Sequence, residues 1–202
     1  IHFMNQNTKK QAKKNIAKHY DLGNNFYECW LDKSMTYSSA IFNSKADNLE
    51  TAQYNKYKRL AELSSIKNGD EILEIGCGWG GFSEFIGNNY DCKVTAVTIS
   101  EEQFNFAKNR INEAKLSEKV NILFCDYRNI IGKFDKIVSI EMFEAVGKEY
   151  WNTFFQKIEN ILKPNGNVSL QLITIDDKIF NVYENNPDFI QKYIFPGGFL
   201  PS

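Results

Sequence analysis

A glycine-rich stretch at residues 74–81 carries the clearest chemical signal in this sequence. It reads Glu-Ile-Gly-Cys-Gly-Trp-Gly-Gly and follows a short apolar run. Gly76, Gly78 and Gly80 would let the backbone turn tightly, adopt positive φ angles and approach a ligand closely. The backbone amides of a helix that starts after this turn would face that ligand. Glu74, just before the turn, can hold a cationic or hydroxylated ligand group, so we expect a small-molecule cofactor here.

The pattern around the turn narrows the type of cofactor. Gly76, Gly78 and Gly81 match G-x-G-x-x-G, which alone is weak evidence for a dinucleotide site. The next predicted strand, 93–99, ends in Thr-Ile-Ser and not in the acid that binds a ribose diol in dinucleotide enzymes. The order E-x-G-x-G-x-G instead resembles motif I of the methyltransferases that use S-adenosylmethionine (SAM). A turn with only a structural role is the alternative.

Alternating strand and helix patterns predict the scaffold that positions this turn. Strands are expected at 71–75, 93–99, 120–125, 134–140 and 167–175, and helices at 49–66, about 80–89, 101–115 and 149–162. Repeated strand–helix units imply an α/β fold, a mostly parallel sheet with right-handed crossovers and helices on both faces. We therefore predict a Rossmann-like core at residues 67–202. An N-terminal helical segment, residues 1–66, would cover its site.

Residues that follow successive strands should share one crevice, because ligands of such sheets lie beyond the carboxyl ends of the strands. Thr98 and Gln103 can hydrogen-bond a ribose diol where no acid is present. Asp126 can meet an adenine amino group, and Tyr127 and Arg128 can flank the ring. The alternatives are that Asp126 only caps a turn and that Gln103 is a solvated helix residue.

Two acids follow the predicted strand 134–140. Glu141 is assigned the simpler role, an acid that favours a helix N-terminus. Glu144, one turn further and beside Phe143, can point into the crevice. An unpaired carboxylate in apolar surroundings is costly, so a buried Glu144 would need a partner. This makes Glu144 a candidate general base, or the residue that holds one.

Composition limits the function classes. The chain has 202 residues and a net charge of −1, so no global field steers it to nucleic acid. Its four cysteines lack C-x-x-C spacing and it has only two histidines, which indicates reduced thiols in the cytoplasm and argues against a metal site or a His-based triad. No apolar run approaches the length of a membrane span, and no secretory signal opens the chain. It starts at Ile1 and ends at Ser202, and we expect a fragment of a longer protein.

The N-terminal region combines basic and aromatic residues. Residues 4–18 contain five lysines at near-helical spacing, which indicates a solvated helix face. The alternative is contact with an anionic membrane surface, where each lysine could contribute about 1 kcal/mol. Residues 19–42 are dense in aromatics without strand alternation, so we expect helices and loops that pack over the site.

Six stretches, in order along nearly the whole chain, resemble the cyclopropane-fatty-acyl-phospholipid synthase family, which includes the mycolic acid cyclopropane synthases. They are His19-Tyr-Asp-Leu-Gly-Asn, Met35-Thr-Tyr-Ser-Ser-Ala, Glu74-Ile-Gly-Cys-Gly-Trp-Gly-Gly, Val97-Thr-Ile-Ser-Glu-Glu-Gln, Ile140-Glu-Met-Phe-Glu-Ala-Val-Gly and Tyr193-Ile-Phe-Pro-Gly-Gly. The resemblance implies the class I SAM-dependent methyltransferase fold. It also implies methyl transfer to a cis double bond of a phospholipid acyl chain through a carbocation, giving a cyclopropane or a methylene- or methyl-branched chain.

The resemblance extends to individual site residues. The expected cofactor contacts are Tyr37, Ser38, Glu74, Gly76, Cys77, Gly78, Trp79, Gly80, Thr98, Ile99, Ser100, Gln103, Asp126, Tyr127 and Arg128. The family's general base is a bound bicarbonate ion, and its matched contacts are Glu144, Ser39, Ile140 and Gln171. Ser39 stands where the family has cysteine, and Gln171 where it has histidine; glutamine donates a hydrogen bond but carries no charge. The family's tyrosine and most of its acyl-binding helical region would lie beyond Ser202.

The family also implies a location and partners. We expect a cytoplasmic protein with peripheral contact to a phospholipid substrate at the inner face of the membrane, and a homodimer is one option. Two alternatives remain open. The scaffold also resembles plant alkaloid N-methyltransferases, so a small amine could be the acceptor. The other alternative is an inactive module that binds SAM or lipid. It is suggested by Ser39, Gln171 and the missing C-terminal part, whereas the intact glycine turn and Glu144 argue against it.

Overall fold

A five-stranded parallel sheet forms the centre of the computed structural model, which describes residues 7–20 and 23–202. Its strands are β1 (Glu71–Ile75), β2 (Lys93–Thr98), β3 (Val120–Phe124), β4 (Phe134–Ile140) and β5 (Leu162–Gln171). Their order is β3-β2-β1-β4-β5, and every neighbouring pair is parallel. The predicted parallel sheet is thus confirmed. The chain reverses its winding between β1 and β4, which is where such sheets place a ligand.

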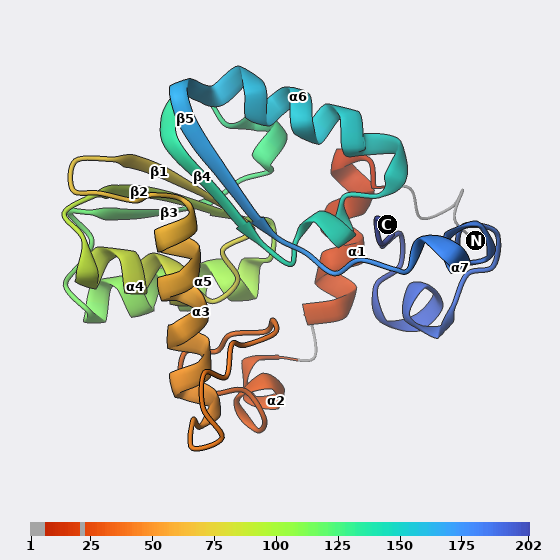
Figure 1. Ribbon diagram of the computed structural model, residues 1–202, viewed down its shortest axis with the longest axis horizontal. Helices are drawn as coiled ribbons and strands as arrows, with labels where there is room; N and C mark the ends of the chain where they lie inside the picture. Colours follow the sequence, from red (N-terminus) through yellow and green to blue (C-terminus); the bar gives the residue numbers. More distant parts are fainter. Residues whose placement is uncertain (1–6, 21–22) are drawn as a thin grey trace.

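Helices cover both faces of the sheet, as the sequence predicts (Figure 1). On one face lie α3 (Leu49–Leu63), α4 (Gly81–Asn89) and α5 (Glu101–Glu113), and on the other lies α6 (Trp151–Ile161). Alternation along β1 explains the two layers, because successive strand side chains point to opposite faces. Ile72 packs into the core with α3, α4 and α5, whereas Leu73 packs into the core with α6, and both are fully buried.

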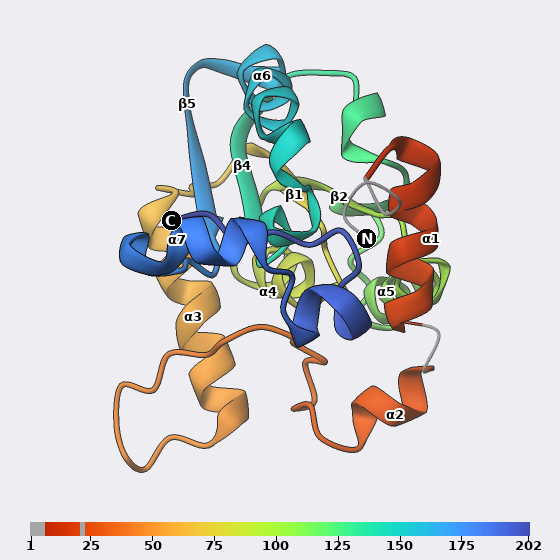
Figure 2. The same ribbon diagram turned by 90° about the vertical axis from the view of Figure 1, so that its right-hand side faces the viewer.

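Segments from both ends of the chain lie beyond the carboxyl ends of the strands (Figures 1 and 2). They are α1 (Lys9–Tyr20), α2 (Asn24–Glu28), α7 (Asp177–Asn185) and a π-helical turn (Ile190–Ile194). The Asn7 side-chain amide donates a hydrogen bond to the Gly197 carbonyl at 2.8 Å and so joins the two segments. No helix within residues 7–20 or 23–202 is long and apolar enough to cross a bilayer.

Part of the predicted N-terminal cover, the helix α3, packs into the same hydrophobic core as the sheet. Tyr57, Leu60 and Ala61 of α3 belong to the same buried cluster as Ile72 of the sheet. The boundary at residue 66 therefore falls inside one continuous core, and the division into two parts stays a prediction. The motif that starts at His19 includes residues 21–22, which lie outside the described residues.

The predicted bounds of the last strand are wrong at both ends. Residues 163–166, which separate the predicted helix 149–162 from the predicted strand 167–175, lie inside β5, where Phe134 pairs with Leu162 and Lys136 pairs with Asn167. Asn165 has a φ of 63°, so the turn-forming residues make an irregularity within the strand rather than end the helix before it. The strand ends at Gln171, not at residue 175. The predicted helix 149–162 begins as a 3₁₀ turn, Lys148–Tyr150, followed by α6.

Candidate functional site

A cavity of about 750 Å³ opens at the carboxyl ends of β1, β2 and β4. Every predicted cofactor residue lines it except Gly80 and Ser100, which instead start the helices α4 and α5. Of the predicted catalytic residues, Ser39, Ile140 and Glu144 line it, and Gln171 lies behind Ser39 at a hydrogen-bond distance of 3.1 Å. A pocket of this size, with few convergent polar groups, is typical of a small-molecule site. The structure therefore brings together nearly all the residues that the sequence singled out.

The glycine turn forms one wall of the cavity and is fixed to β2. The backbone amides of Gly76 and Cys77 both donate to the Val97 carbonyl, at 2.9 and 3.0 Å. Gly76 has a φ of 81°, and a Cβ atom there would lie 2.5 Å from the Met142 side chain. Gly78 has a φ of 54°, but a Cβ atom there would meet nothing within 4 Å. Gly76 is therefore required for packing, whereas Gly78 leaves space for a ligand.

Two buried groups of opposite charge lie on the other side of the turn. Glu74 is 2% exposed, and burial raises its pKa to about 8, against the opposing effect of a hydrogen bond from the Ser83 hydroxyl. Lys56 is fully buried, and burial lowers its pKa to about 8. The Lys56 ammonium donates to the Ser38 hydroxyl at 2.5 Å. Glu74 lines the cavity, and a pKa shift of this size in a cavity is typical of functional sites.

The end of β2 supplies a preorganised amide. The Thr98 hydroxyl donates to Gln103 Oε1 at 2.9 Å, and the Ser100 side chain accepts from the Gln103 backbone amide. Gln103 is 5% exposed, so the alternative that it is a solvated helix residue is wrong. Among the described residues nothing accepts from its Nε2 group, which is therefore free to donate to a ligand hydroxyl. Ser100 acts as the N-cap that sets this geometry, and not as a direct wall of the cavity.

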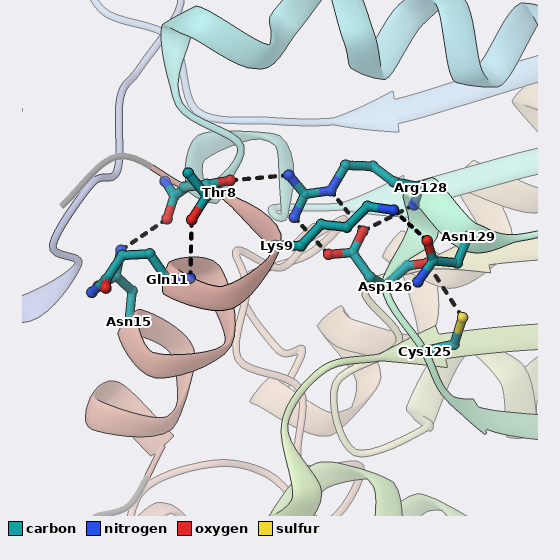
Figure 3. Close-up of polar contacts among 9 residues, drawn as sticks. Thr8, Lys9, Gln11, Asn15, Cys125, Asp126, Arg128 and Asn129 are labelled. Carbon is teal, nitrogen blue, oxygen red and sulfur yellow. Dashed lines mark hydrogen bonds and ion pairs between the residues drawn. The ribbon is translucent and has the colours of Figure 1, made fainter.

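Asp126 and Arg128 form a paired site at the end of β3 (Figure 3). Arg128 donates to both carboxylate oxygens of Asp126, at 2.8 and 2.6 Å, and to the Asn7 carbonyl at 3.0 Å. Burial alone would raise the pKa of Asp126, but the hydrogen bonds from Arg128 hold it below its usual value. Asp126 also caps the 3₁₀ turn Tyr127–Asn129, so the capping role predicted as its alternative is present.

The N-terminal segment closes this side of the cavity. Figure 3 shows Lys9 of α1 reaching the Asn129 side chain, and Gln11 bonding back to the start of its own helix. Asn15 donates to the Asn7 side chain at 2.9 Å inside the protein. Lys9, Lys10, Lys13 and Lys14 are all exposed, in agreement with a solvated helix face, although Lys9 contacts Asn129 and the Lys13 ammonium lies 4.6 Å from the centroid of the Phe124 ring.

Aromatic side chains form the wall nearest α2. Tyr37 lies 5.6 Å from Tyr27, 5.3 Å from Trp30 and 6.4 Å from Phe195, measured between ring centroids. Trp79 is 2% exposed and donates from its indole nitrogen to Asn24 at 2.7 Å. These faces give the cavity an apolar lining that can stabilise a positive charge.

Glu141 has a different place from the one predicted. Its Oε1 atom accepts from the Ser39 amide, the Ser39 hydroxyl and Gln171 Nε2, each at 2.9 Å. The prediction that it favours a helix N-terminus is wrong, because the 3₁₀ turn that follows begins at Phe143 and has no side-chain cap. The place of Glu141 in the cavity could have been inferred from its position directly after the last residue of a central strand.

Glu144 points into the cavity region as predicted. Its Oε1 atom accepts from the Ile173 amide at 2.5 Å, whereas its buried Oε2 atom has no hydrogen-bond partner among the described residues. Burial, and secondly the charge of Glu141, raise the pKa of Glu144. Glu141 and Glu144 thus give the cavity two neighbouring carboxyl groups with different surroundings.

Sequence reasoning missed two polar residues of α3. Gln53 is 2% exposed and donates to the Ser38 carbonyl at 2.9 Å, while its buried Oε1 atom has no partner among the described residues. Lys56, three positions later, is the buried cation described above. The signal was present, because a polar pair at i, i+3 on the same side of the helix as Tyr57 and Leu60 conflicts with an apolar face.

Among the described residues, no group of three side chains of the metal-binding types could hold a metal ion.

Comparisons with known proteins agree with this geometry. Residues 7–202 match the family model described as mycolic acid cyclopropane synthetase. The cyclopropane-fatty-acyl-phospholipid synthase of Escherichia coli (strain K12) is 42% identical over 198 residues, which are 98% of this chain and 50% of that protein. The tuberculostearic acid methyltransferase UfaA1 of Mycobacterium tuberculosis is 38% identical over 202 residues, 96% of this chain and 47% of that protein. The chain thus spans about half the length of these relatives.

Solved structures show the same architecture. The mycolic acid cyclopropane synthase CmaA1 in complex with SAH and CTAB matches with a TM-score of 0.87 and 30% identity, over 94% of this chain and 70% of that one. The cyclopropane synthase MmaA2 from Mycobacterium tuberculosis matches with the same score, identity and coverage. The fold is therefore the class I SAM-dependent methyltransferase fold, as predicted. Because the family model matches residues 7–202 and these relatives are 30–42% identical over nearly the whole chain, the chain belongs to the mycolic acid cyclopropane synthetase family.

Proposed function

We propose that this protein binds SAM and transfers its methyl group to a cis double bond in the acyl chain of a phospholipid. The observation that carries the proposal is one cavity that joins the glycine turn to two neighbouring carboxyl groups and an aromatic wall. A site that only bound a nucleotide-like cofactor would need the glycine turn but neither the two carboxyl groups nor the aromatic wall. The carboxyl groups and the apolar lining suit a reaction that forms a cation and then removes a proton.

The residues present fit SAM. Gly78 leaves open space at the turn, and Gln53 Oε1 and Tyr127 Oη are buried polar atoms without a partner among the described residues. Glu74 and the turn would hold the amino-acid end and ribose, and Gln103 Nε2 would donate to the diol. Asp126 and Tyr127 would meet the adenine. When bound, SAM supplies an electrophilic methyl group on a positively charged sulfur.

The chain's own residues suit the rest of the reaction. Addition of a methyl group to an alkene leaves a positive charge on the neighbouring acyl carbon. Tyr37 and the rings around it can stabilise this charge through their faces. A carboxylate in the cavity can then accept the proton that must leave. The product is a cyclopropane if the proton leaves the new methyl carbon and the ring closes. It is a methylene branch if a hydride first shifts from the methylated carbon to the cationic carbon and the proton then leaves the methyl carbon. The family's bicarbonate ion stays a prediction.

The substrate class implies contact with a membrane surface, which we propose to be peripheral and cytoplasmic. Large apolar side chains are exposed on the C-terminal cover, among them Val182 at 63%, Phe189 at 64% and Tyr193 at 67%. The helix α1, which carries four exposed lysines, lies at the same end of the molecule as α7 (Figure 1). Binding to anionic vesicles should weaken steeply as salt rises if these lysines contribute. Salt-insensitive binding would assign the contact to the apolar side chains alone.

Mass spectrometry of lipids tests the reaction. The protein, in its longest natural form, is incubated with SAM and phospholipid vesicles that carry cis-unsaturated chains. We expect an unsaturated chain to gain one CH₂ unit, and fragmentation then separates a ring from a branch. If no lipid gains mass although SAM binding is measured, the proposal fails. Methyl transfer to soluble amines would then identify an N-methyltransferase, and no transfer at all an inactive binding module.

A further inference from the structure

Two of the four residues expected to hold a bicarbonate ion, Ser39 and Gln171, already bind a side chain. The resemblance assigns this role to Glu144, Ser39, Ile140 and Gln171. In the structure the Ser39 amide, the Ser39 hydroxyl and Gln171 Nε2 all donate to one oxygen of Glu141. A carboxylate and a bicarbonate ion present the same planar, singly charged pair of oxygens. The donor set therefore does not fit a free bicarbonate ion in addition to Glu141.

The backbone at Glu141 is held in an unfavourable conformation. Its φ is 46°, in the left-handed region, which is disfavoured for a residue with a Cβ atom. Its amide donates to the Gln171 carbonyl at 2.7 Å, so the end of β5 fixes the residue. Strain of this kind is concentrated at functional sites. Glycine would relieve the strain, yet the chain places a carboxylate here.

The second oxygen of Glu141 is available for chemistry. The three hydrogen bonds go to Oε1, and nothing among the described residues donates to Oε2. Glu141 lines the same cavity as Glu144 and the glycine turn. Its charge contributes to the raised pKa of both Tyr37 and Glu144, for which burial is the first cause, so the carboxylate lies close to the aromatic wall.

We propose that the Glu141 carboxylate is the general base of this protein and replaces bicarbonate. The inference rests on the proposed function. After the methyl carbon has bonded to one alkene carbon, the other alkene carbon carries the positive charge. Glu141 Oε2 accepts a proton from the new methyl carbon, and the electron pair of that C–H bond forms the bond that closes the three-membered ring. Glu141 is left as the neutral acid and returns the proton to water.

Two substitutions at one position separate this role from a structural one. Glu141→Gln keeps an oxygen for the three donors but removes the basic group. Glu141→Gly relieves the positive φ and leaves the donors free for a small anion. We expect wild-type turnover to be unchanged when dissolved bicarbonate is removed. Glu141→Gln should lose about a hundredfold or more in turnover, the usual scale for a general base, and should not recover with bicarbonate or formate.

The glycine variant provides the sharper test. Glu141→Gly should be inactive without bicarbonate and regain turnover when bicarbonate or formate is added, because the anion takes the place of the missing carboxylate. Calorimetric titration with formate, without SAM or lipid, gives a second readout: Glu141→Gly should bind formate, and the wild type should not. Glu159→Gln, on the exposed side of α6, is the matched control and should behave as wild type.

Three results would overturn the proposal. The first is severalfold stimulation of the wild type by bicarbonate. The second is full activity of Glu141→Gln. The third is a glycine variant that neither binds formate nor responds to it. If the wild type itself methylates no lipid, the proposed function fails and the base assignment fails with it. The formate titration then still reports whether the donors of Ser39 and Gln171 form an anion site.

Discussion

Lys56 and Glu74 lie buried beside the glycine turn, and each has a pKa of about 8 although one is a base and the other an acid. Burial moves the two values in opposite directions, since it disfavours the charged form of each group. Each group also favours the charged form of the other. The protein therefore has two buried groups whose charge can change near neutral pH, and Glu74 of this pair lines the cavity.

The first prediction concerns the pH dependence of stability at Glu74. The folded carboxyl keeps its proton up to about pH 8, whereas the ordinary value is 4.5. Between these values the folded state binds more protons than the unfolded state, so Glu74 lowers the free energy of unfolding as pH rises. Glu74→Gln cannot ionise. Its melting temperature relative to wild type should therefore rise from pH 5 to pH 8.

A control on the same strand isolates this effect. Glu71→Gln changes an exposed carboxylate at the start of β1, which pairs with Lys163 at 2.6 Å. Its melting temperature relative to wild type should not show the same rise. A constant difference between Glu74→Gln and wild type across the range would contradict the raised pKa of Glu74.

A second prediction separates the two roles of glycine at the turn. Gly78→Ala introduces a side chain at positive φ, at a cost of roughly 1–2 kcal/mol, and fills space next to the cavity. Gly69→Ala is the matched control, because its φ is also positive and its Cβ would also meet nothing within 4 Å, but it lies outside the cavity. We expect both variants to lose some stability. Only Gly78→Ala should weaken SAM binding, by tenfold or more in calorimetry.

If Gly69→Ala weakened SAM binding as much as Gly78→Ala, the effect would come from general loosening of the core and not from the cavity. Gly76→Ala should be more harmful to folding than either, because its Cβ would lie 2.5 Å from Met142. The expected order of melting temperatures therefore places Gly76→Ala lowest.

The third prediction concerns Glu144. Replacement by glutamine should leave SAM affinity within a few-fold of wild type but reduce turnover by about a hundredfold or more. The reason is that its buried Oε2 atom has no partner among the described residues and so is placed to act on substrate or on the neighbouring Glu141. Affinity is measured by calorimetry and turnover by mass spectrometry of lipids. A loss of SAM affinity equal to the loss of rate would make Glu144 a cofactor ligand.

The fourth prediction concerns the Asp126–Arg128 pair. Both side chains are mostly buried, with 12% and 10% of their surface exposed. Arg128→Met should lower the free energy of unfolding by about 3 kcal/mol, because it leaves a buried carboxylate without its partner. The double variant with Asp126→Asn should lose less than the sum of the two single changes. Urea unfolding provides the measurement.

The exposed pair Lys33–Glu50 is the comparison, since its atoms are 3.9 Å apart and its side chains are 87% and 55% exposed. Lys33→Met should change stability by less than about 1 kcal/mol. Strictly additive losses at Asp126 and Arg128 would show that the two residues do not act as a pair.

The sequence predicted the features that depend on local patterns. The apolar strands, the glycine turn and the acids after the strands follow from residue spacing, and the parallel sheet then places them at one edge. Glu141 was misjudged because its partners are distant: Ser39 is 102 residues earlier and Gln171 is 30 residues later. No local pattern shows which way such a side chain turns.

Lys56 and the bounds of β5 were missed for related reasons. A lysine on a helix is normally expected to face solvent, and only the packing of α3 against the sheet shows that this one is buried. The Lys-Pro-Asn-Gly run has strong turn propensity, yet pairing with β4 overrides it at both of its ends. Tertiary context therefore decided the assignments that local propensity could not.

The hydrogen bond between Asn7 and Gly197 also bears on the order in which the protein can be made. It joins groups that are 190 positions apart, and Arg128 holds the Asn7 carbonyl from the middle of the chain. During synthesis the sheet from β1 to β4 can form before this contact exists, because these four strands all precede residue 197 and pair with one another in the order β3-β2-β1-β4. The wall over the cavity must wait until residue 197 has left the ribosome. Contacts of such long range are slow to form, so cofactor retention should be the last property that the nascent chain acquires.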